Sequence, residues 1–294
     1  MISIILDSLN AMTPILAASV GEIVAERSGV VNIGIEGIML IAAFVAAYVS
    51  AVTGNPFLAF LAGTAIGALL GLVHGVISTY LRGDQIVAGI GINTLAYGAT
   101  TIGMVAVWGS YGTSPAVPKI SMIVVGTSFI SPAIFVAIAI ALLVWLLLTR
   151  TLLGLRIRAC GEDPRAAEAM GINIYTVRIL STVFGGATAG FAGAFLSVGW
   201  LGTFTRGITG GLGFIALANV AFSNWNPLLA IVGAFVFGFF NRIALWLASL
   251  PHLVVYSYIV KVVPYVGTLA VLALVARRAR LAIPRALGKP YIKE

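Results

Sequence analysis

The stretch "SPAIFVAIAIALLVWLLLT", residues 131–149, carries no charged side chain. A transmembrane α-helix needs about 20 predominantly apolar residues to cross the hydrocarbon core of a bilayer. This run approaches that length, and several other runs in the chain reach or exceed it. The runs are continuously apolar, whereas the strands of an outer-membrane barrel alternate polar and apolar residues. The sequence therefore predicts an all-α, polytopic transmembrane helix bundle.

The composition of the whole chain agrees with this class of protein. The 294 residues are 60% hydrophobic and only 9% charged, and the mean hydropathy is +1.09. The net charge of +8 comes from basic residues that cluster at the ends of apolar runs, as the positive-inside rule expects. We therefore expect a lipid bilayer and no nucleic acid as the partner of these charges. Cys160 is the one cysteine, which excludes an internal disulfide, and we expect no metal site.

Nine apolar segments are candidates for membrane spans, and we expect about nine spans within a range of eight to ten. The segments are 2–25, 30–52, 57–81, 86–109, 131–149, 177–203, 208–225, 227–249 and 253–276. Segment 208–225 is short and Gly-rich at its start, so it could instead be broken or turn back inside the membrane.

Lysine and arginine gather in the loop 150–178 and in the tail 277–294. The positive-inside rule places both in the cytoplasm, and four spans separate them, so the parity is consistent. A segment 208–225 that turned back would leave the basic tail outside, so we prefer nine spans with the N-terminus outside. The chain 1–294 is interpreted as a single transmembrane domain.

Small residues recur at four-residue spacing in two of the segments. They are Gly63, Gly67, Gly71 and Gly75 in one segment, and Gly186, Gly190 and Ala194 in the other. Such spacing places the small residues on one helix face and allows a neighbouring backbone to approach closely. Both sets therefore predict close helix packing inside the membrane.

The stretch "GEDPRAAEAMG", residues 161–171, concentrates charge in an otherwise apolar chain. Asp163 can cap a helix by accepting hydrogen bonds from free backbone N–H groups, and Pro164 suits the first helical position. Gly171 can take the left-handed conformation that ends a helix. These signals predict one short cytoplasmic helix of about two turns.

An isolated helix of this length is marginal in water, so a partner surface is expected to hold it. Ala166, Ala167 and Ala169 would allow that surface to approach closely. The alternative is a solvated loop whose charges only obey the positive-inside rule.

Polar residues inside apolar segments are candidates for a substrate pathway. Glu36 lies in such a segment, where an ionised carboxylate costs several kcal/mol, and Asn32 lies on the same helical face. Gly34 and Gly37 would permit a break between helical segments, which is tolerated where the break lines a cavity. The alternative for Glu36 is a structural contact with a buried arginine or with backbone N–H groups.

Asn93, Phe214 and Asn219 complete the set of pathway candidates. An amide both donates and accepts hydrogen bonds, which suits a polar substrate, and an aromatic ring can stack on a planar group. The alternative for each asparagine is a hydrogen bond between helices, a common use of asparagine in membrane bundles.

Two long motifs resemble one family of transport proteins. "GLRIRACGEDPRAAEAMGINIYTVR", residues 154–178, resembles the cytoplasmic coupling segment of ABC importer permeases of the branched-chain amino acid, ribose and nucleoside superfamily. "GEIVAERSGVVNIGIEGIMLIAAF", residues 21–44, is similar to the nucleoside and simple-sugar branch of that superfamily. The resemblance extends from about residue 14 to residue 276.

The resemblance implies a permease subunit of a binding-protein-dependent ABC importer for nucleosides in a bacterial plasma membrane. It implies that this chain forms half of the translocation pathway beside a second, distinct permease. It further implies an extracytoplasmic substrate-binding protein and an ATPase with two fused nucleotide-binding halves. The coupling residues that it implies are Glu162, Asp163, Pro164, Arg165, Ala166, Ala167 and Gly171.

The chain itself is expected to be non-catalytic and to carry no cofactor. It contains no G-x-x-x-x-G-K-[ST] pattern, so we expect ATP and Mg²⁺ on the partner ATPase. The alternatives are the same role for a simple sugar or a branched-chain amino acid, and an ion-driven secondary transporter. The last would require repeated halves with broken helices at matching positions, which the sequence does not display.

Overall fold

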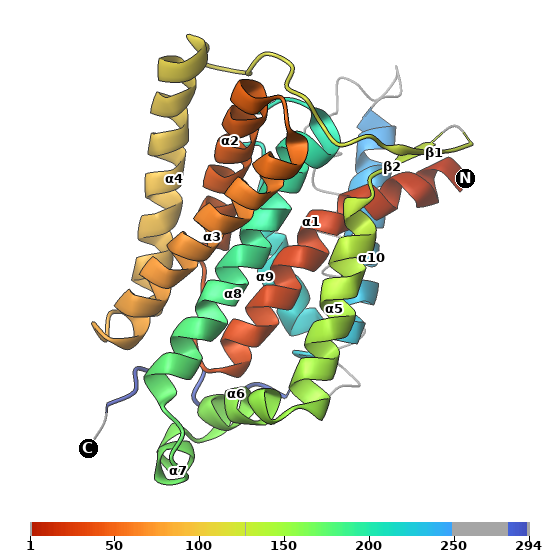
Figure 1. The fold of residues 1–294 in the computed structure, drawn as a ribbon. Coiled ribbons are helices and arrows are strands. Elements are labelled where there is room, and N and C mark those ends of the chain that lie inside the picture. The colour runs from red at the N-terminus through yellow and green to blue at the C-terminus, as the bar shows by residue number, and fades with distance from the viewer. Residues whose placement is uncertain (1, 127, 249–281, 293–294) are drawn as a thin grey trace.

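The computed structural model describes residues 2–126, 128–248 and 282–292, which are drawn in colour in Figure 1. The helices of the described residues are α1 (Ile2–Arg27), α2 (Ile35–Thr53), α3 (Pro56–Thr79), α4 (Gln85–Trp108), α5 (Ala133–Arg150), α6 (Leu152–Glu162), α7 (Pro164–Ala169), α8 (Ile174–Ala194), α9 (Leu212–Phe222) and α10 (Pro227–Ala248). A π-helical turn, η1 (Phe195–Leu201), continues α8. Strand β1 (Ile123–Val125) pairs antiparallel with β2 (Ser128–Ile130) in a hairpin, with Ile123 opposite Ile130.

Seven helices of the described residues are long and apolar enough to cross a membrane. They are α1, α2, α3, α4, α5, α8 with η1, and α10. Figure 1 shows them as a bundle, with α6 and α7 at one end and the β1–β2 hairpin at the other. We call these the α7 end and the hairpin end. The expected polytopic helical bundle is therefore confirmed, and the predicted segment 253–276 lies outside the described residues.

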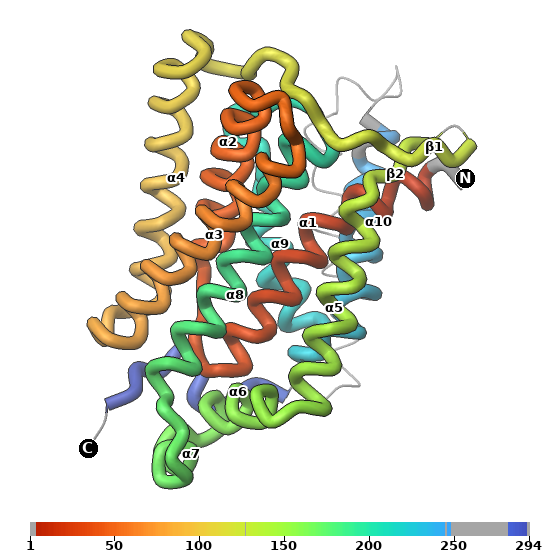
Figure 2. Tube along the Cα trace, in the orientation of Figure 1, coloured from red at the N-terminus to blue at the C-terminus, as the bar shows by residue number. Residues whose placement is uncertain are grey.

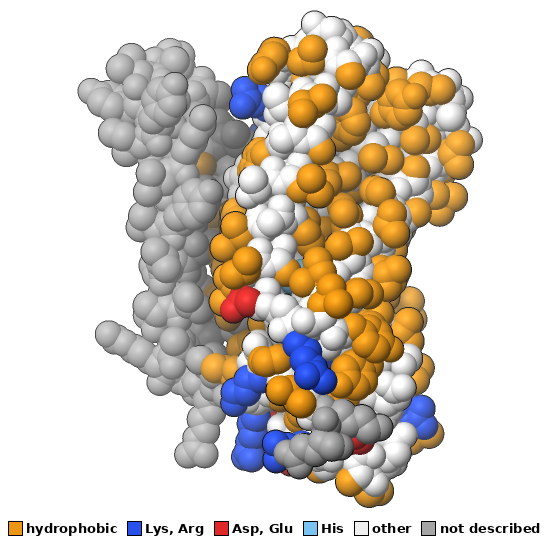
Figure 3. Space-filling view, turned by 90° about the vertical axis from the view of Figure 1, so that its left-hand side faces the viewer, with side chains coloured by type: hydrophobic (Ala, Val, Ile, Leu, Met, Phe, Trp, Pro, Cys, Tyr) orange, Lys and Arg blue, Asp and Glu red, His pale blue; other side chains and the backbone are white. Residues whose placement is uncertain are grey.

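Hydrophobic side chains cover the middle of the face shown in Figure 3, and lysine and arginine gather toward the α7 end. On this face, α3 and α4 each begin after a residue whose side chain caps the helix. The Asn55 side chain accepts hydrogen bonds from the N–H groups of Phe57 and Leu58 at the start of α3. Asp84 accepts from Ile86 at the start of α4. Each cap satisfies N–H groups that have no partner within their helix.

Helices α3 and α8 pack closely through the two predicted sets of small residues. A Cβ atom added to Gly67 would collide with the carbonyl oxygen of Gly186, and one added to Gly190 would collide with that of Gly63. The backbones approach because neither helix has a side chain at these positions. The close packing predicted from the glycine spacing is confirmed.

The predicted span 208–225 takes a different form. Its helical part is α9, whose 11 residues span about 16 Å, which is roughly half of the hydrocarbon core. A broken segment is one of the forms that the sequence left open here, and the structure has this form. At the hairpin end, Phe204 donates its N–H to Ser114, and at the α7 end the carbonyl of Asn224 accepts from Arg27. Residues 204–224 thus cross the bundle as a non-helical half followed by a half-helix, which preserves the parity.

A second non-helical stretch, residues 28–34, joins α1 to α2. It corresponds to the glycine-permitted break that the sequence suggested near Gly34. The tube in Figure 2 shows α1 and α8 at the centre of the bundle, with α4 at its margin. The stretch 28–34 is mostly buried, whereas residues 204–211 are partly exposed and only Phe204 and Thr209 among them are fully buried.

Candidate coupling and translocation sites

Helix α7 confirms the short helix expected in residues 161–171. The Asp163 carboxylate accepts a hydrogen bond from the N–H of Ala166 at 3.1 Å, and Pro164 occupies the first helical position. Gly171 follows the helix with φ of 81°, in the left-handed region. The helix is shorter than expected, because its six residues form less than two turns.

Sequence reasoning missed α6, which lies directly before α7. Its glycines lower helix propensity, so the apolar pattern between Leu152 and Ile157 was not assigned to a helix. The structure explains Gly161, because an added Cβ atom there would collide with the carbonyl oxygen of Arg27. Thr151 caps the helix through the N–H of Gly154 at 3.1 Å. The sequence signal for α6 was Thr151 as a capping residue, followed by four apolar residues among the next six.

One side of α7 faces the chain's own interior. Ala167 is buried in a small apolar cluster with Cys160, Ile174 and Tyr291. The expectation that Ala167 offers itself to a partner protein is therefore corrected. Ala166 and Ala169 are exposed, and so are the charged candidates Glu162, Asp163 and Arg165.

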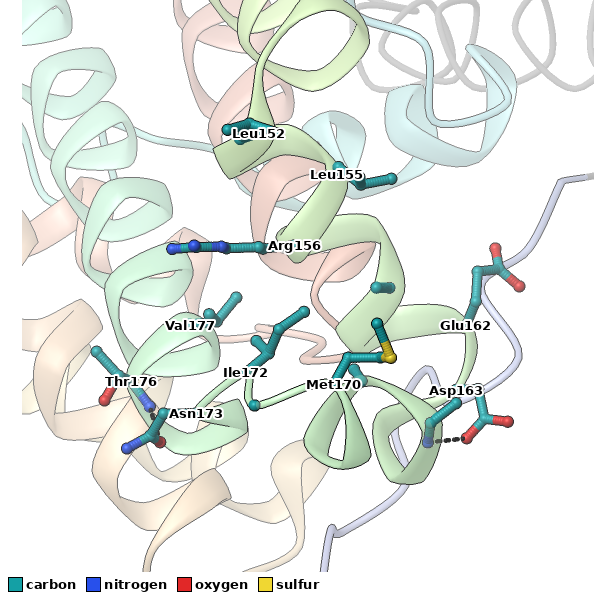
Figure 4. A pocket seen from close by; sticks show the side chains of 14 residues that line it. Leu152, Leu155, Arg156, Glu162, Asp163, Met170, Ile172, Asn173, Thr176 and Val177 are labelled. Carbon is teal, nitrogen blue, oxygen red and sulfur yellow. Dashed lines mark hydrogen bonds between the residues drawn. The ribbon is translucent and has the colours of Figure 1, made fainter.

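A groove of about 760 Å³ separates α7 from α6 and from the start of α8 (Figure 4). Its lining residues are Leu152, Leu155, Arg156, Ala159, Glu162, Asp163, Ala166, Ala167, Met170, Gly171, Ile172, Asn173, Thr176 and Val177. Met170 is 83% exposed although it is apolar. Exposed apolar groups rimmed by charged groups mark surfaces that bind other proteins.

The predicted basic tail is more ordered at residues 282–292 than its composition suggested. Ala286 donates its N–H to the carbonyl of Gly161 at 2.8 Å, and Gly288 donates to that of Gly29 at 3.2 Å. The Tyr291 hydroxyl donates to the Glu168 carboxylate of α7. These contacts, which a search for helical patterns cannot find, place the tail against α7.

Two titratable groups at this junction are perturbed. The hydrogen bond to the Glu168 carboxylate raises the pKa of Tyr291 to about 12, because a phenolate there would be repelled. Burial raises the pKa of the Cys160 thiol to about 11. Both groups are therefore neutral near pH 7.

Arg178 of α8 joins the tail to the membrane part of the bundle. Its side chain is fully buried. Nε donates to the carbonyl of Ser28, and Nη1 donates to the carbonyl of Lys289, both at 3.1 Å. One side chain thus connects α8, the 28–34 stretch and the tail.

The backbone of the 28–34 stretch is satisfied by side chains of other helices. The Val31 N–H donates to Gln85 at 2.8 Å, and the Val31 carbonyl lies 2.9 Å from Nε2 of His74. Water is absent from the hydrocarbon region, so each free backbone group there needs such a partner. His74 therefore has a structural role in this stretch.

Asn32 and Asn93 contribute to the same network. The Asn32 side chain accepts from the N–H of Gly34 at 3.0 Å. Asn93 donates to the carbonyl of Ile33 at 3.0 Å and accepts from the N–H of Gly37 at 2.7 Å. These are the hydrogen bonds of the structural alternative, and a contact of either amide with substrate stays a prediction.

Glu36 holds the two non-helical stretches together. Its carboxylate, fully buried in the first turn of α2, accepts from Thr209 Oγ1 at 2.6 Å, Gly211 N at 2.8 Å and Gly213 N at 2.7 Å. The last two groups lie at the N-terminus of α9, where the helix dipole favours a negative charge. A structural contact with backbone N–H groups was one of the alternatives left open for Glu36, and the structure shows this contact.

Asn219 and Phe214, both on α9, face opposite environments. Asn219 is fully buried and donates to Ser19 Oγ at 2.9 Å and to the carbonyl of Ala230 at 3.1 Å. Phe214 is 47% exposed and follows the residue whose N–H binds Glu36. The structure therefore brings Asn32, Glu36 and Asn93 together, but Asn219 lies apart from them.

Tyr97 of α4 was missed as a candidate. It is 44% exposed, and its ring lies 4.0 Å from the position of an added Cβ atom at Gly207. Its place one turn after Asn93 was the signal available in the sequence. Tyr97 and Phe214 thus present two partly exposed aromatic rings on elements that the Glu36 network connects.

Comparison with known proteins agrees with this architecture. Residues 4–272 match the model of a family described as the permease component of branched-chain amino acid transport systems. The chain is 36% identical to a guanosine ABC transporter permease of Bacillus subtilis, over 95% of this chain and 93% of that protein. It is 35% identical to a nucleoside ABC transporter permease of Lactococcus lactis, over 99% and 96%. It is also 35% identical to a protein described as a glucose ABC transporter permease of Haloferax volcanii, over 98% and 96%.

Proposed function

Because this chain belongs to the family of branched-chain amino acid transport permease components, we propose that it is the membrane permease subunit of an ABC importer for nucleosides. The observation that carries the nucleoside assignment is the similarity to the guanosine and nucleoside permeases over nearly the whole chain. The seven span-length helices of the described residues support a multi-pass membrane protein. The α7 end and the C-terminus are assigned to the cytoplasm by their basic residues.

Coupling to ATP hydrolysis is assigned to α7. The chain has no P-loop motif, so ATP and Mg²⁺ belong to an ATPase subunit, and this chain performs no chemistry itself. The exposed Ala166, Ala169 and Met170 form the face on which the ATPase docks. Motion of α7 reaches the spans through its short connection to α8.

The remaining partners are a second homologous permease, distinct from this chain, and an extracytoplasmic substrate-binding protein. The ATPase has two fused nucleotide-binding halves. The passage for substrate lies along the side of the bundle that carries Tyr97 and Phe214, whose rings offer stacking surfaces to a base. Behind this side, the hydrogen bonds of Glu36, Asn32 and Asn93 hold the backbone in place. The hydrogen bonds of Asn219 position α9.

The test is uptake by the reconstituted transporter, with its substrate-binding protein and ATPase, in proteoliposomes. We expect ATP-dependent uptake of labelled guanosine, which excess unlabelled nucleoside abolishes and excess glucose leaves unchanged.

A simple sugar is the second candidate, favoured by the similarity to the Haloferax protein. Glucose uptake that guanosine does not inhibit would support this candidate and refute the nucleoside assignment. Uptake driven by an ion gradient without ATP would refute the ABC mechanism itself.

A further inference from the structure

A second cavity at the α7 end, which we call the tail cavity, lies between α7 and the tail segment 282–292. Its volume is about 380 Å³. Its lining residues are Glu162, Asp163, Pro164, Arg165, Arg178, Arg285, Ala286, Lys289, Pro290, Tyr291 and Ile292. Glu162 and Asp163 also line the groove of Figure 4, so the two depressions adjoin on the surface around α7.

The tail cavity has an excess of positive charge. Four of its lining residues are basic and two are acidic. Arg178 is fully buried, and its Nη2 donates no hydrogen bond to any residue that the structure describes. The charge of this buried guanidinium adds to the positive potential of the cavity wall, which favours an anionic ligand.

The walls of the tail cavity are fixed by contacts from several elements. Arg178 binds the carbonyl of Lys289, Gly161 binds the N–H of Ala286, and Tyr291 binds Glu168. The ring of Tyr291 also packs edge-on against that of Tyr175 at 5.9 Å. A site whose walls are already ordered loses little conformational entropy when a ligand binds.

We propose that the tail cavity receives a carboxylate side chain of the ATPase subunit, so that the tail is a second docking wall beside α7. This inference rests on the proposed function. The occupant follows from two observations, the excess of positive charge and the shared residues Glu162 and Asp163. Because of the shared residues, a protein seated on α7 also covers the tail cavity.

A zero-length carbodiimide cross-link tests the contact directly. The reagent activates a carboxylate and joins it to a lysine amine without a spacer, so the two groups must lie in direct contact. In the assembled transporter we expect an amide between Lys289 and an aspartate or glutamate of the ATPase, identified by mass spectrometry of the cross-linked peptide. Lys119, in the loop before the hairpin, is the internal control and should give no cross-link to the ATPase. A Lys289 that never cross-links to the ATPase would overturn the proposal.

A charge reversal measures the energetic contribution. We expect R285E with K289E to weaken ATPase binding to the permease pair by at least about tenfold, since close charge pairs contribute strongly at interfaces. R82E makes the same kind of change outside the cavity and should leave binding within about twofold. K289Q removes one charge without reversing it, so it should weaken binding by an intermediate factor. This milder variant keeps the proposal testable if the double variant misfolds.

The outcomes separate this inference from the proposed function. If M170E abolishes ATPase binding while the R285E and K289E variant binds normally, the tail cavity is not a docking wall and the proposed function stands. If both variants bind and couple normally, the assignment of α7 fails as well. If the double variant loses only a bound anionic phospholipid, measured by native mass spectrometry, the occupant is a lipid headgroup and the proposal is overturned.

Discussion

At the scale of single residues, Glu36 shows how a carboxylate is accommodated inside a membrane bundle. Its three hydrogen-bond donors come from a stretch that lies 173 to 177 positions later in the chain. Two of the donors are free N–H groups of α9, which have no partner within their own helix. The charge and the half-helix therefore satisfy each other, and neither would be stable here alone.

Replacing Glu36 with glutamine tests this balance. The amide keeps the shape but presents an NH₂ group to one of the backbone donors, so we expect a loss of about 3 kcal/mol in the free energy of unfolding. T209V removes one of the three donors and should cost about 1 kcal/mol. Thermal unfolding of the detergent-purified protein, monitored by size-exclusion chromatography after heating, measures both losses of stability. An E36Q variant as stable as the native protein would show that the carboxylate does not support α9.

Cys160 provides a second prediction at this scale. Burial and the raised pKa of about 11 leave very little thiolate near pH 7.5, so a maleimide should not label the folded protein. Removing the Tyr291 ring by Y291A opens the cluster around the thiol. We expect labelling at least about tenfold faster in this variant, because labelling requires local opening. Equal labelling rates would show that the tail does not cover Cys160.

The tail contact should be insensitive to pH across the physiological range. The neutral phenol of Tyr291 is the form that Glu168 holds, so its contribution is complete below about pH 10, the usual pKa of tyrosine. It is lost only as pH rises through about 12. Labelling of Cys160 in the native protein, corrected for the thiolate fraction, should therefore not change between pH 6 and pH 9.

At the scale of elements, the packing of α3 on α8 depends on glycine. G67A should reduce the free energy of unfolding by about 2 kcal/mol or more, since an added methyl group would force the two backbones apart. G91A is the matched control, because nothing lies within 4 Å of its added Cβ atom. The control should be neutral or gain up to about 1 kcal/mol from the higher helix propensity of alanine. Parallel thermal unfolding curves distinguish the two positions.

The exposed and the buried side of α7 predict different effects of the same substitution. A166W places a large ring on the exposed side and should abolish uptake and stimulated ATP hydrolysis while the protein still folds. A167W places the same ring in the buried cluster and should lower the yield of folded protein instead. An A166W variant that transports normally would show that this side of α7 does not contact the ATPase.

At the scale of the whole molecule, the crossing pattern predicts opposite locations for the two ends of the bundle. In a C160S background, a cysteine at Ser121 should react with a membrane-impermeant maleimide in intact spheroplasts. A cysteine at Met170, which is exposed at the α7 end, should react only after the membrane is opened. Labelling of both in intact spheroplasts would refute the single crossing by α5 that separates these two positions.

The bundle and the short helix α7 were predictable from the sequence because their signals are local. Apolar length predicts spans, and Asp163, Pro164 and Gly171 predict the limits of α7 within a few residues. The glycines of segment 208–225 indicated that it could be broken, but the contact that holds its half-helix was not predictable, because Glu36 lies in a distant element. The packing of residues 282–292 against α7 and α8 was missed for the same reason. The contacts of Arg178 and Tyr291 that hold this segment leave no periodic pattern in the sequence.

The contact between Glu36 and α9 has a consequence for biogenesis. A ribosome adds about 5–20 residues each second, so roughly 10–35 s separate the synthesis of Glu36 from that of its partners. During this interval the carboxyl group in the first two spans lacks its later hydrogen-bond donors, which favours a position near the water boundary. The middle layer of the bundle is therefore completed late, when residues 209–213 emerge and fold against the waiting carboxylate.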